Sequence, residues 1–413
     1  MFKYKHAFNI KLLYWLCLYA LVLIFIGYSY NITEFIIPKL NATLSDYDNN
    51  FTFTQYKEYT IFPSIIKGQN YKSSETIVLI LHISIDQNLE KIRNHLINWE
   101  GFISLSVYIN PEKHNFKLIS CAYCKLKNII NGFKNIDIHF IIRNTELQNN
   151  FYINDFYLLQ MNKYCDKTYI NIDTTVCINN TYNIKEKAIS MSNYPINILR
   201  NIARKFSYGK YIVIADMDHM FSKSFHNKML DVGRKYLNNN SNNVLVYRIF
   251  EVKDENLANG PKNKKDLQQM IKDKSAFIFH HFYAGAHSIS KLDEWFNVTE
   301  SEDGYTSIQH EEPYTRFNWE PQFMSLATIP YHDERFTYPN RDNTCLRWQL
   351  CKEGYKFLVV NDVFMFHLGL KDKNESSAVG MAKRMTASTF SKAMEAFKKD
   401  MSTNQKNKTH CHF

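Results

Sequence analysis

One short stretch constrains the fold of this chain more than any other: the apolar run from Tyr211 to Ala215, which ends in Asp216-Met217-Asp218. A run this apolar and β-branched is typical of a strand buried on both faces in an α/β sheet. Residues two apart on a strand point to the same side. If strand geometry continues to its end, Asp216 and Asp218 converge on one ion. Ligands of such sheets bind where strands end, so we expect a ligand site here.

The two carboxylates are suited to a hard divalent cation. Mg²⁺ and Mn²⁺ take oxygen ligands and typically bind through one or two protein carboxylates plus substrate phosphates. We therefore interpret Asp216 and Asp218 as a clamp on the diphosphate of an activated sugar. The alternative is a solvated turn after a core strand, because Asp-x-Asp alone is unspecific. A calcium EF-hand loop is excluded, since Met220 and Phe221 stand where it needs a further carboxylate and a glycine.

Size and charge limit the classes of function. With 413 residues, the chain can form one large α/β domain or two modest ones. Its 50 Lys and Arg against 40 Asp and Glu give a net charge of +10, and the basic residues are spread along the sequence. Binding to nucleic acid would need a concentrated basic face, so we expect no nucleic-acid partner. Attraction to anionic substrates is the milder inference.

The N-terminus predicts a membrane anchor. Residues 1–11 are rich in basic side chains and residues 12–28 are mainly apolar. A spanning helix needs about 20 mainly apolar residues, with ~17 as a lower limit. The positive-inside rule then predicts a cytoplasmic tail at 1–11 and a type II signal-anchor at 12–28. The alternative is a cleaved signal peptide, for which Gly27-Tyr28-Ser29 is a poor cleavage site.

The rest of the chain is then expected to be lumenal. Residues 29–74 are polar and without sustained periodicity, which indicates a stem. The catalytic domain is predicted at 75–400, followed by a polar, frayed tail at 401–413. Acceptor sequons for N-glycosylation fit a secretory route. They occur at Asn31, Asn41, Asn50, Asn179, Asn239, Asn297, Asn374 and Asn407.

The cysteines agree in part with an oxidising lumen. Cys17 lies in the predicted anchor, which leaves an odd number, so one is free or pairs with another chain. Cys121 and Cys124 resemble half a zinc site, but without a second CxxC they are better explained by disulfides. Cys165 and Cys177 flank a short Asn/Thr-rich loop that a disulfide between them would close.

Strand-like runs alternate with helical patterns from residue 76 onward, which predicts an α/β domain with a mainly parallel central sheet. The predicted strands are 77–81, 105–109, 136–142, 244–252 and 357–360, and the predicted helices are 89–99, 195–206 and 222–236. The second helix carries a polar stripe of Asn197, Arg200 and Arg204 beside an apolar face. That stripe either contacts a nucleotide or is an ordinary solvent-exposed face.

Four short sequence patches occur in one order with sensible spacing. Each patch alone is unspecific, but the ordered set is specific. The patches are Tyr194–Arg204, Asp216–Asp218, Trp319-Glu320-Pro321 with Tyr331–Phe336, and His367-Leu368-Gly369-Leu370-Lys371. Over roughly residues 75–375 this set resembles glycosyltransferase family 49, the glucuronyltransferases of dystroglycan glycosylation. The resemblance implies a lumenal, Golgi-membrane enzyme with a GT-A fold, which uses a UDP-sugar and Mn²⁺ or Mg²⁺.

The same resemblance implies roles for particular residues. Asp216, Asp218 and His367 would bind the metal, and imidazole suits Mn²⁺ beside carboxylates. The residues that would bind the donor are Asn197, Arg200, Arg204 and Lys371, with Lys371 facing the diphosphate. The alternative for His367 is a core histidine after the strand 357–360.

The acceptor side is implied by the third patch. Family glucuronyltransferases invert at the anomeric carbon, so one general base is expected, and Asp333 or Glu334 would supply it. Trp319, Glu320 and Arg335 would contact the acceptor glycan. The alternatives are a turn in which Asp333 and Glu334 pair with Arg335, and a buried Trp319.

One departure from the family pattern affects the functional interpretation. A glycine-rich stretch usually follows the Arg-Phe pair, whereas this chain has Thr337-Tyr338-Pro339-Asn340-Arg341-Asp342. We therefore predict a glycosyltransferase that transfers glucuronic acid from UDP-glucuronate to a glycan, acting as a monomer or homodimer. The alternative is an inactive family member that serves as a membrane-bound scaffold or glycan-binding protein. A metal-dependent phosphoesterase would need more clustered His and Asp ligands.

Overall fold

The computed structural model describes residues 53–69, 73–109, 116–144, 165, 182–281, 285–301, 304–370, 373–403 and 411. The predicted anchor at 12–28 lies outside these residues, as does the predicted stem up to residue 52. In the described ranges, no helix is both long and apolar enough to cross a bilayer.

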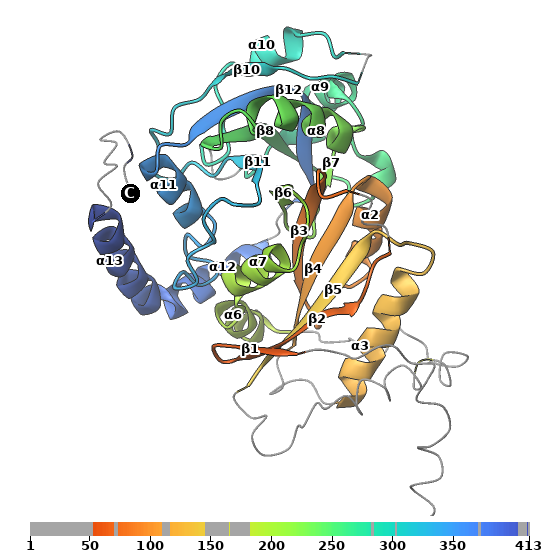
Figure 1. Cartoon of the computed structure of the whole chain (residues 1–413), viewed down its shortest axis with the longest axis vertical. Helices are drawn as coiled ribbons and strands as arrows, with labels where there is room; N and C mark the ends of the chain where they lie inside the picture. The colour runs from red at the N-terminus through yellow and green to blue at the C-terminus, as the bar shows by residue number, and fades with distance from the viewer. Residues whose placement is uncertain are drawn as a thin grey trace, which may run out of the picture. The chain divides into compact units, whose positions relative to one another are not determined.

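The chain forms alternating strands and helices around one large sheet (Figure 1). The strands are β1 Thr54–Tyr56, β2 Tyr59–Ile66, β3 Ile77–Ser84, β4 Phe102–Ile109, β5 Ile136–Arg143, β6 Tyr211–Ile214, β7 His219–Phe221, β8 Asn243–Val252, β9 Ala276–Ile278, β10 Ile308–Glu311, β11 Gln322–Leu326 and β12 Lys356–Leu368. The helices are α2 Lys91–Asn98, α3 Phe116–Ile129, α6 Ile184–Ser192, α7 Ile196–Lys205, α8 Phe225–Tyr236, α9 Lys264–Lys272, α10 Leu292–Asn297, α11 Thr344–Lys352, α12 Lys373–Met385, α13 Ala387–Thr403 and the 3₁₀ turn η2 Leu257–Asn259.

The sheet is mixed, so the prediction of a mainly parallel sheet is wrong. Its order is β1-β2-β5-β4-β3-β6-β11-β8-β12-β10, with β7 on β12 and β9 on β8. The neighbours β5, β4, β3 and β6 run parallel, as expected from the strand-helix alternation in this half of the chain. From β6 onward the pairs are antiparallel except β8 with β12. No helix separates the short strands β6 and β7, so the alternation rule does not apply there.

The sheet also begins earlier than predicted. β1 and β2 form a hairpin that pairs with β5, so residues 54–66 belong to the folded domain and not to a stem. β2 buries Tyr59 and Ile61 in a cluster with Ile198, Leu199 and Ile202 of α7. The polar sequence around this hairpin hid β2, in which Phe62 and Ile65 are buried as well.

Helices cover both faces of the parallel half of the sheet. In β5, Ile141 packs in the cluster with α7, while its neighbour Phe140 contacts Tyr123 of α3 with ring centroids 6.3 Å apart. Successive strand residues point to opposite faces, so α7 and α3 lie on opposite sides (Figure 1). α7 contacts β3 and β4, and α6 contacts α12.

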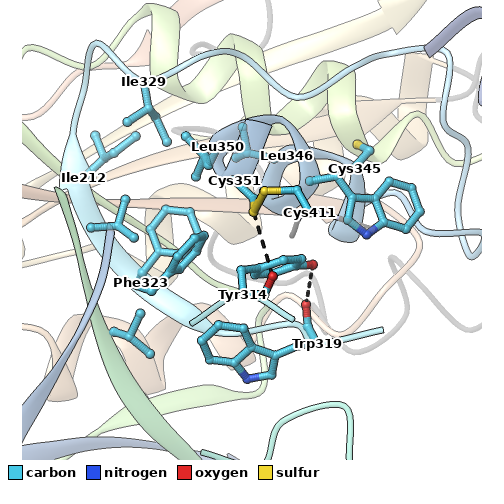
Figure 2. Close-up of a cluster of buried hydrophobic side chains, with 14 of the residues drawn as sticks. Ile212, Tyr314, Trp319, Phe323, Ile329, Cys345, Leu346, Leu350, Cys351 and Cys411 are labelled. Carbon is cyan, nitrogen blue, oxygen red and sulfur yellow. Dashed lines mark hydrogen bonds between the residues drawn. A yellow bond between two sulfur atoms is a disulfide. The ribbon is translucent and has the colours of Figure 1, made fainter. Parts of the chain in front are cut away.

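A second, larger core joins the centre of the sheet to α11 and α13. Figure 2 shows part of this core around Tyr314 and Trp319. Trp319 is fully buried there and packs against both Tyr314 and Phe357, whose ring centroids are 5.4 and 5.5 Å away. The Tyr314 hydroxyl donates a 2.9 Å hydrogen bond to the Trp319 carbonyl (Figure 2). The prediction that Trp319 stacks on an acceptor sugar is therefore wrong, and the alternative of a buried tryptophan is correct.

Two of the disulfides join described residues that are far apart in the sequence. Cys124 pairs with Cys165, so the predicted bridge between Cys165 and Cys177 is wrong. Cys351 pairs with Cys411, which is buried. The tail predicted to be frayed at 401–413 is therefore fixed to α11 at residue 411, and α13 continues to Thr403.

We expect Cys351→Ser to lower the free energy of unfolding by about 2–4 kcal/mol, because the bond between Cys351 and Cys411 closes a long loop in the unfolded chain. Cys345→Ser is the matched control on the same helix, since Cys345 is a free buried cysteine whose Sγ contacts the Asp342 carbonyl. Denaturant unfolding without reductant measures both. Equal losses in the two variants would contradict the expectation.

Candidate active site

The Asp-x-Asp segment is a tight turn between β6 and β7. The backbone N–H of His219 donates to the Asp216 carbonyl at 3.0 Å, and the Asp216 N–H donates to His219 Nδ1 at 3.2 Å. His95 of α2 contacts the Met217 carbonyl through Nε2 at 3.1 Å. Strand geometry ends at Ile214, so the prediction that the two aspartates share one side of a strand is wrong.

Asp216 faces a buried basic pair. Its Oδ1 lies 3.3 Å from His82 Nε2 and 3.5 Å from Arg200 Nη2, while about half of its side chain is exposed. Desolvation by the surrounding protein disfavours the charged carboxylate and acts to raise the pKa of Asp216. The contact with His82 and the charges of His219 and Arg200 outweigh this and hold the pKa well below its usual range. Asp216 is therefore ionised at neutral pH.

The backbone of Asp218 lies beside that of His367. β7 pairs with β12 so that His219 faces His367, and the Leu368 N–H donates to the Asp218 carbonyl at 3.0 Å. The carboxylate itself is held by Lys91 of α2, with Nζ 2.5 Å from Oδ1.

His367 is a strand residue with one ring nitrogen committed. The strand β12 runs on to Leu368, beyond the predicted end at residue 360, and its register shifts between Val359 and Phe364. His367 Nδ1 lies 2.9 Å from the Gly369 carbonyl, which can only accept, so Nδ1 carries the proton and the lone pair of the neutral ring is on Nε2. The ring contacts His219 and Phe279, with centroids 5.7 and 5.1 Å away.

The donor set has the right chemistry for Mn²⁺ or Mg²⁺, because two carboxylates and an imidazole with a free Nε2 lone pair come together on adjoining backbone. The side chains are not yet arranged around one point. Throughout the described ranges, no group of three or more His, Cys, Asp or Glu side chains is positioned to hold an ion. Asp216 contacts Arg200 and Asp218 contacts Lys91 instead, so the metal site remains a prediction.

The polar stripe of α7 is buried, so it is neither a nucleotide-binding surface nor a solvent-exposed face. Asn197 Nδ2 donates to the carbonyls of Asp333 and Asp342, each at 2.9 Å. Arg204 donates to the carbonyls of Pro330 and Ile329 at 2.9 and 2.7 Å. The predicted contact of these two residues with the donor is therefore wrong: their side chains hold the 327–342 loop against α7.

Arg200 is the member of the stripe that reaches the turn. It is buried, its Nη1 donates to Asp342 Oδ2 at 2.8 Å and to Asn197 Oδ1 at 3.1 Å, and its Nη2 faces Asp216. Asp342 comes from the segment that departs from the family pattern. That segment therefore supplies the buried counter-ion of Arg200.

The predicted acceptor-side carboxylates have structural partners. Asp333 accepts from Arg335 Nε at 2.9 Å and Nη2 at 2.6 Å, and Arg335 also pairs with Asp400 at 2.7 Å. Asp333 and Arg335 therefore form the salt-bridged turn that was the predicted alternative to a role at the acceptor.

Glu334 is bound by side chains of the β1–β2 hairpin and of α7. It accepts from the Tyr56 hydroxyl at 3.0 Å and Asn201 Nδ2 at 2.8 Å, and it also pairs with Lys57 of the β1–β2 hairpin. Glu320 is partly exposed and lies 3.6 Å from Arg341 Nη1. Lys371 lies outside the described residues.

Two residues that contact the aspartates, His82 and Lys91, were missed from the sequence. His82 is a buried polar residue inside the apolar strand β3, and its Nδ1 lies 2.9 Å from the Tyr194 hydroxyl. Burial lowers the pKa of His82, so it is neutral at neutral pH. Lys91 lies on α2. The available signal for His82 was a histidine that directly follows the apolar run 77–81. Nothing local marked Lys91.

Residues 76–405 match the protein family described as "Glycosyl-transferase for dystroglycan", Glyco_transf_49. The chain belongs to this glycosyltransferase family. The prediction of a family 49 glycosyltransferase is confirmed.

Two similar relatives are curated proteins. The chain is 23% identical to β-1,4-glucuronyltransferase 1 of Danio rerio over 77% of its own length and 74% of that protein. It is 20% identical to the human xylosyl- and glucuronyltransferase LARGE1 over 71% of its length, but this covers 31% of LARGE1. Among solved structures, S. aureus TarS residues 1–349 is similar with a TM-score of 0.31 and 10% identity, over 81% of this chain and 76% of that one. A likeness at this level carries no argument.

We expect Arg200→Met to destabilise the protein by about 3–5 kcal/mol, because it leaves Asp342 buried without its counter-ion. The double variant Arg200→Met/Asp342→Leu removes both charges, and it should recover most of this loss. Urea unfolding compares the three proteins. If the double variant is as unstable as the single one, the buried ion pair is not the cause.

Proposed function

We propose that this family member transfers glucuronic acid from UDP-glucuronate to a glycan acceptor in the Golgi lumen, with Mn²⁺ or Mg²⁺ and with inversion at the anomeric carbon. The donor is proposed from the glucuronyltransferases that the chain resembles. The observation that carries the proposal is the β7–β12 pairing. It brings Asp218 and His367, far apart in sequence, to the turn that holds Asp216.

Each residue of the site has its own role in this proposal. A divalent cation bound there would neutralise charge on the departing UDP. Asp216 is kept ionised by Arg200 and His82, ready to act as an oxygen ligand. The Gly369 carbonyl fixes the ring of His367 so that Nε2 presents its lone pair. Lys371 completes the proposal as a contact to the diphosphate.

The location is proposed from several features together. The disulfides Cys124–Cys165 and Cys351–Cys411 are of the kind that form in an oxidising compartment, which supports a lumenal domain. The type II anchor at 12–28, the acceptor sequons and a homodimer remain part of the proposal.

Asp218→Asn tests the assignment. Loss of one metal-binding carboxylate should lower metal-dependent turnover of UDP-glucuronate by about 100-fold or more. The control is Asp231→Asn, the same change on α8, which should leave turnover within about twofold. Release of UDP is measured with Mn²⁺ and with EDTA. Equal rates with EDTA would contradict metal dependence. Absence of turnover in the wild type would favour the inactive scaffold instead.

We expect Asp333→Asn and Glu334→Gln to act mainly on stability, because both carboxylates are bound by side chains of the protein itself. Each should keep turnover within about tenfold, whereas loss of a general base typically costs about 10²–10⁴-fold. Rates and unfolding midpoints are measured together. A 100-fold slower but equally stable variant would identify the base and contradict this expectation.

A further inference from the structure

Helix α2 holds the Asp-x-Asp turn with one face. Asn98 exchanges two hydrogen bonds with the backbone of Phe221, at 2.9 and 2.7 Å, and His95 contacts the Met217 carbonyl at 3.1 Å. Lys91 occupies the next position on the same face, since residues four and seven apart lie on one side of a helix. Its ammonium lies 2.5 Å from Asp218 Oδ1.

The three contacts differ in how tightly they are held. His95 is fully buried. The side-chain amide of Asn98 donates through Nδ2 and accepts through Oδ1, in both cases with the backbone of Phe221, so the helix is fixed against the turn. The side chain of Lys91 is 41% exposed and that of Asp218 is 34% exposed. Ion pairs this exposed contribute little to stability, and a lysine stem can turn about several bonds. Lys91 is therefore a positioned but movable charge.

Cation binding at Asp218 conflicts with the contact seen here. A divalent cation on Asp218 would repel an ammonium at the same carboxylate, so Lys91 must move when the cation binds. The diphosphate of the donor brings two negative charges to the same place. These two charges and the charge of Asp218 make three negative charges, which the two positive charges of the cation and the one of Lys91 balance. Asp216 already has Arg200 as its partner.

We propose that Lys91 is a donor-binding residue, whose ammonium neutralises Asp218 before the cation arrives and contacts the diphosphate of the nucleotide sugar afterwards. This inference rests on the proposed function. It adds a lysine from α2 to the residues that face the leaving group.

Lys91→Met tests the proposal, because methionine keeps most of the length of the side chain and removes its charge. Lys210→Met is the matched control: Lys210 pairs with Glu75 at 3.3 Å, and its side chain is also 41% exposed. Titration calorimetry measures Mn²⁺ binding without nucleotide and UDP binding at saturating Mn²⁺. We expect Lys91→Met to bind Mn²⁺ alone about 3- to 10-fold more tightly and UDP about 10-fold more weakly. Lys210→Met should change neither by more than about twofold.

The result that overturns the proposal is UDP affinity in Lys91→Met equal to or tighter than in the wild type. Lys91→Arg keeps the charge and should keep UDP affinity within about threefold, with unfolding midpoints of all variants within about 2 °C of the wild type. If the wild type binds neither Mn²⁺ nor UDP, the proposed function fails and this inference fails with it. If the wild type binds both and Lys91→Met behaves identically, only the role of Lys91 is contradicted.

Discussion

The geometry of the site depends on one buried ion pair between Arg200 and Asp342. Arg200 extends from α7 between Asp342, in the loop that follows β11, and Asp216, in the turn that follows β6. Burying a guanidinium is costly unless carboxylates and hydrogen bonds compensate it, and here Asp342, Asp216 and Asn197 do so. The same helix holds the loop backbone through Asn197 and Arg204. Packing of the loop and orientation of Asp216 are therefore coupled through one side chain.

The predictions that held were those in which a local pattern and the tertiary structure agree. The apolar runs at 77–81 and 136–142 are strands because they are buried on both faces, and the helix after Pro195 begins at Ile196. The resemblance to the family pointed to Asp218 and His367, whose backbones the β7–β12 pairing brings together, while metal binding by their side chains stays a prediction. A pattern of residues along one segment could not show that pairing, because it joins segments far apart in the sequence.

The predictions that failed concern the surroundings of individual side chains, that is, whether each contacts solvent, ligand or protein. The stripe of Asn197, Arg200 and Arg204 has the composition of a solvent-exposed face, and it is buried only because a loop more than a hundred residues later covers it. Trp319 has the chemistry for stacking on a sugar, and it fills the core instead. The segment 337–342 departs from the family pattern, yet Asp342 within it pairs with Arg200, so the departure is built into the site.

The central claim is that Asp216, Asp218 and His367 gather around one divalent cation when a nucleotide is bound. A crystal structure with Mn²⁺ and UDP, with anomalous data at the manganese edge, measures this directly. We expect one manganese peak about 2 Å from carboxylate oxygens of Asp216 and Asp218 and from His367 Nε2, with UDP phosphate oxygens completing the shell. A manganese ion bound elsewhere, or UDP bound with the Lys91–Asp218 contact intact and no metal, would contradict it.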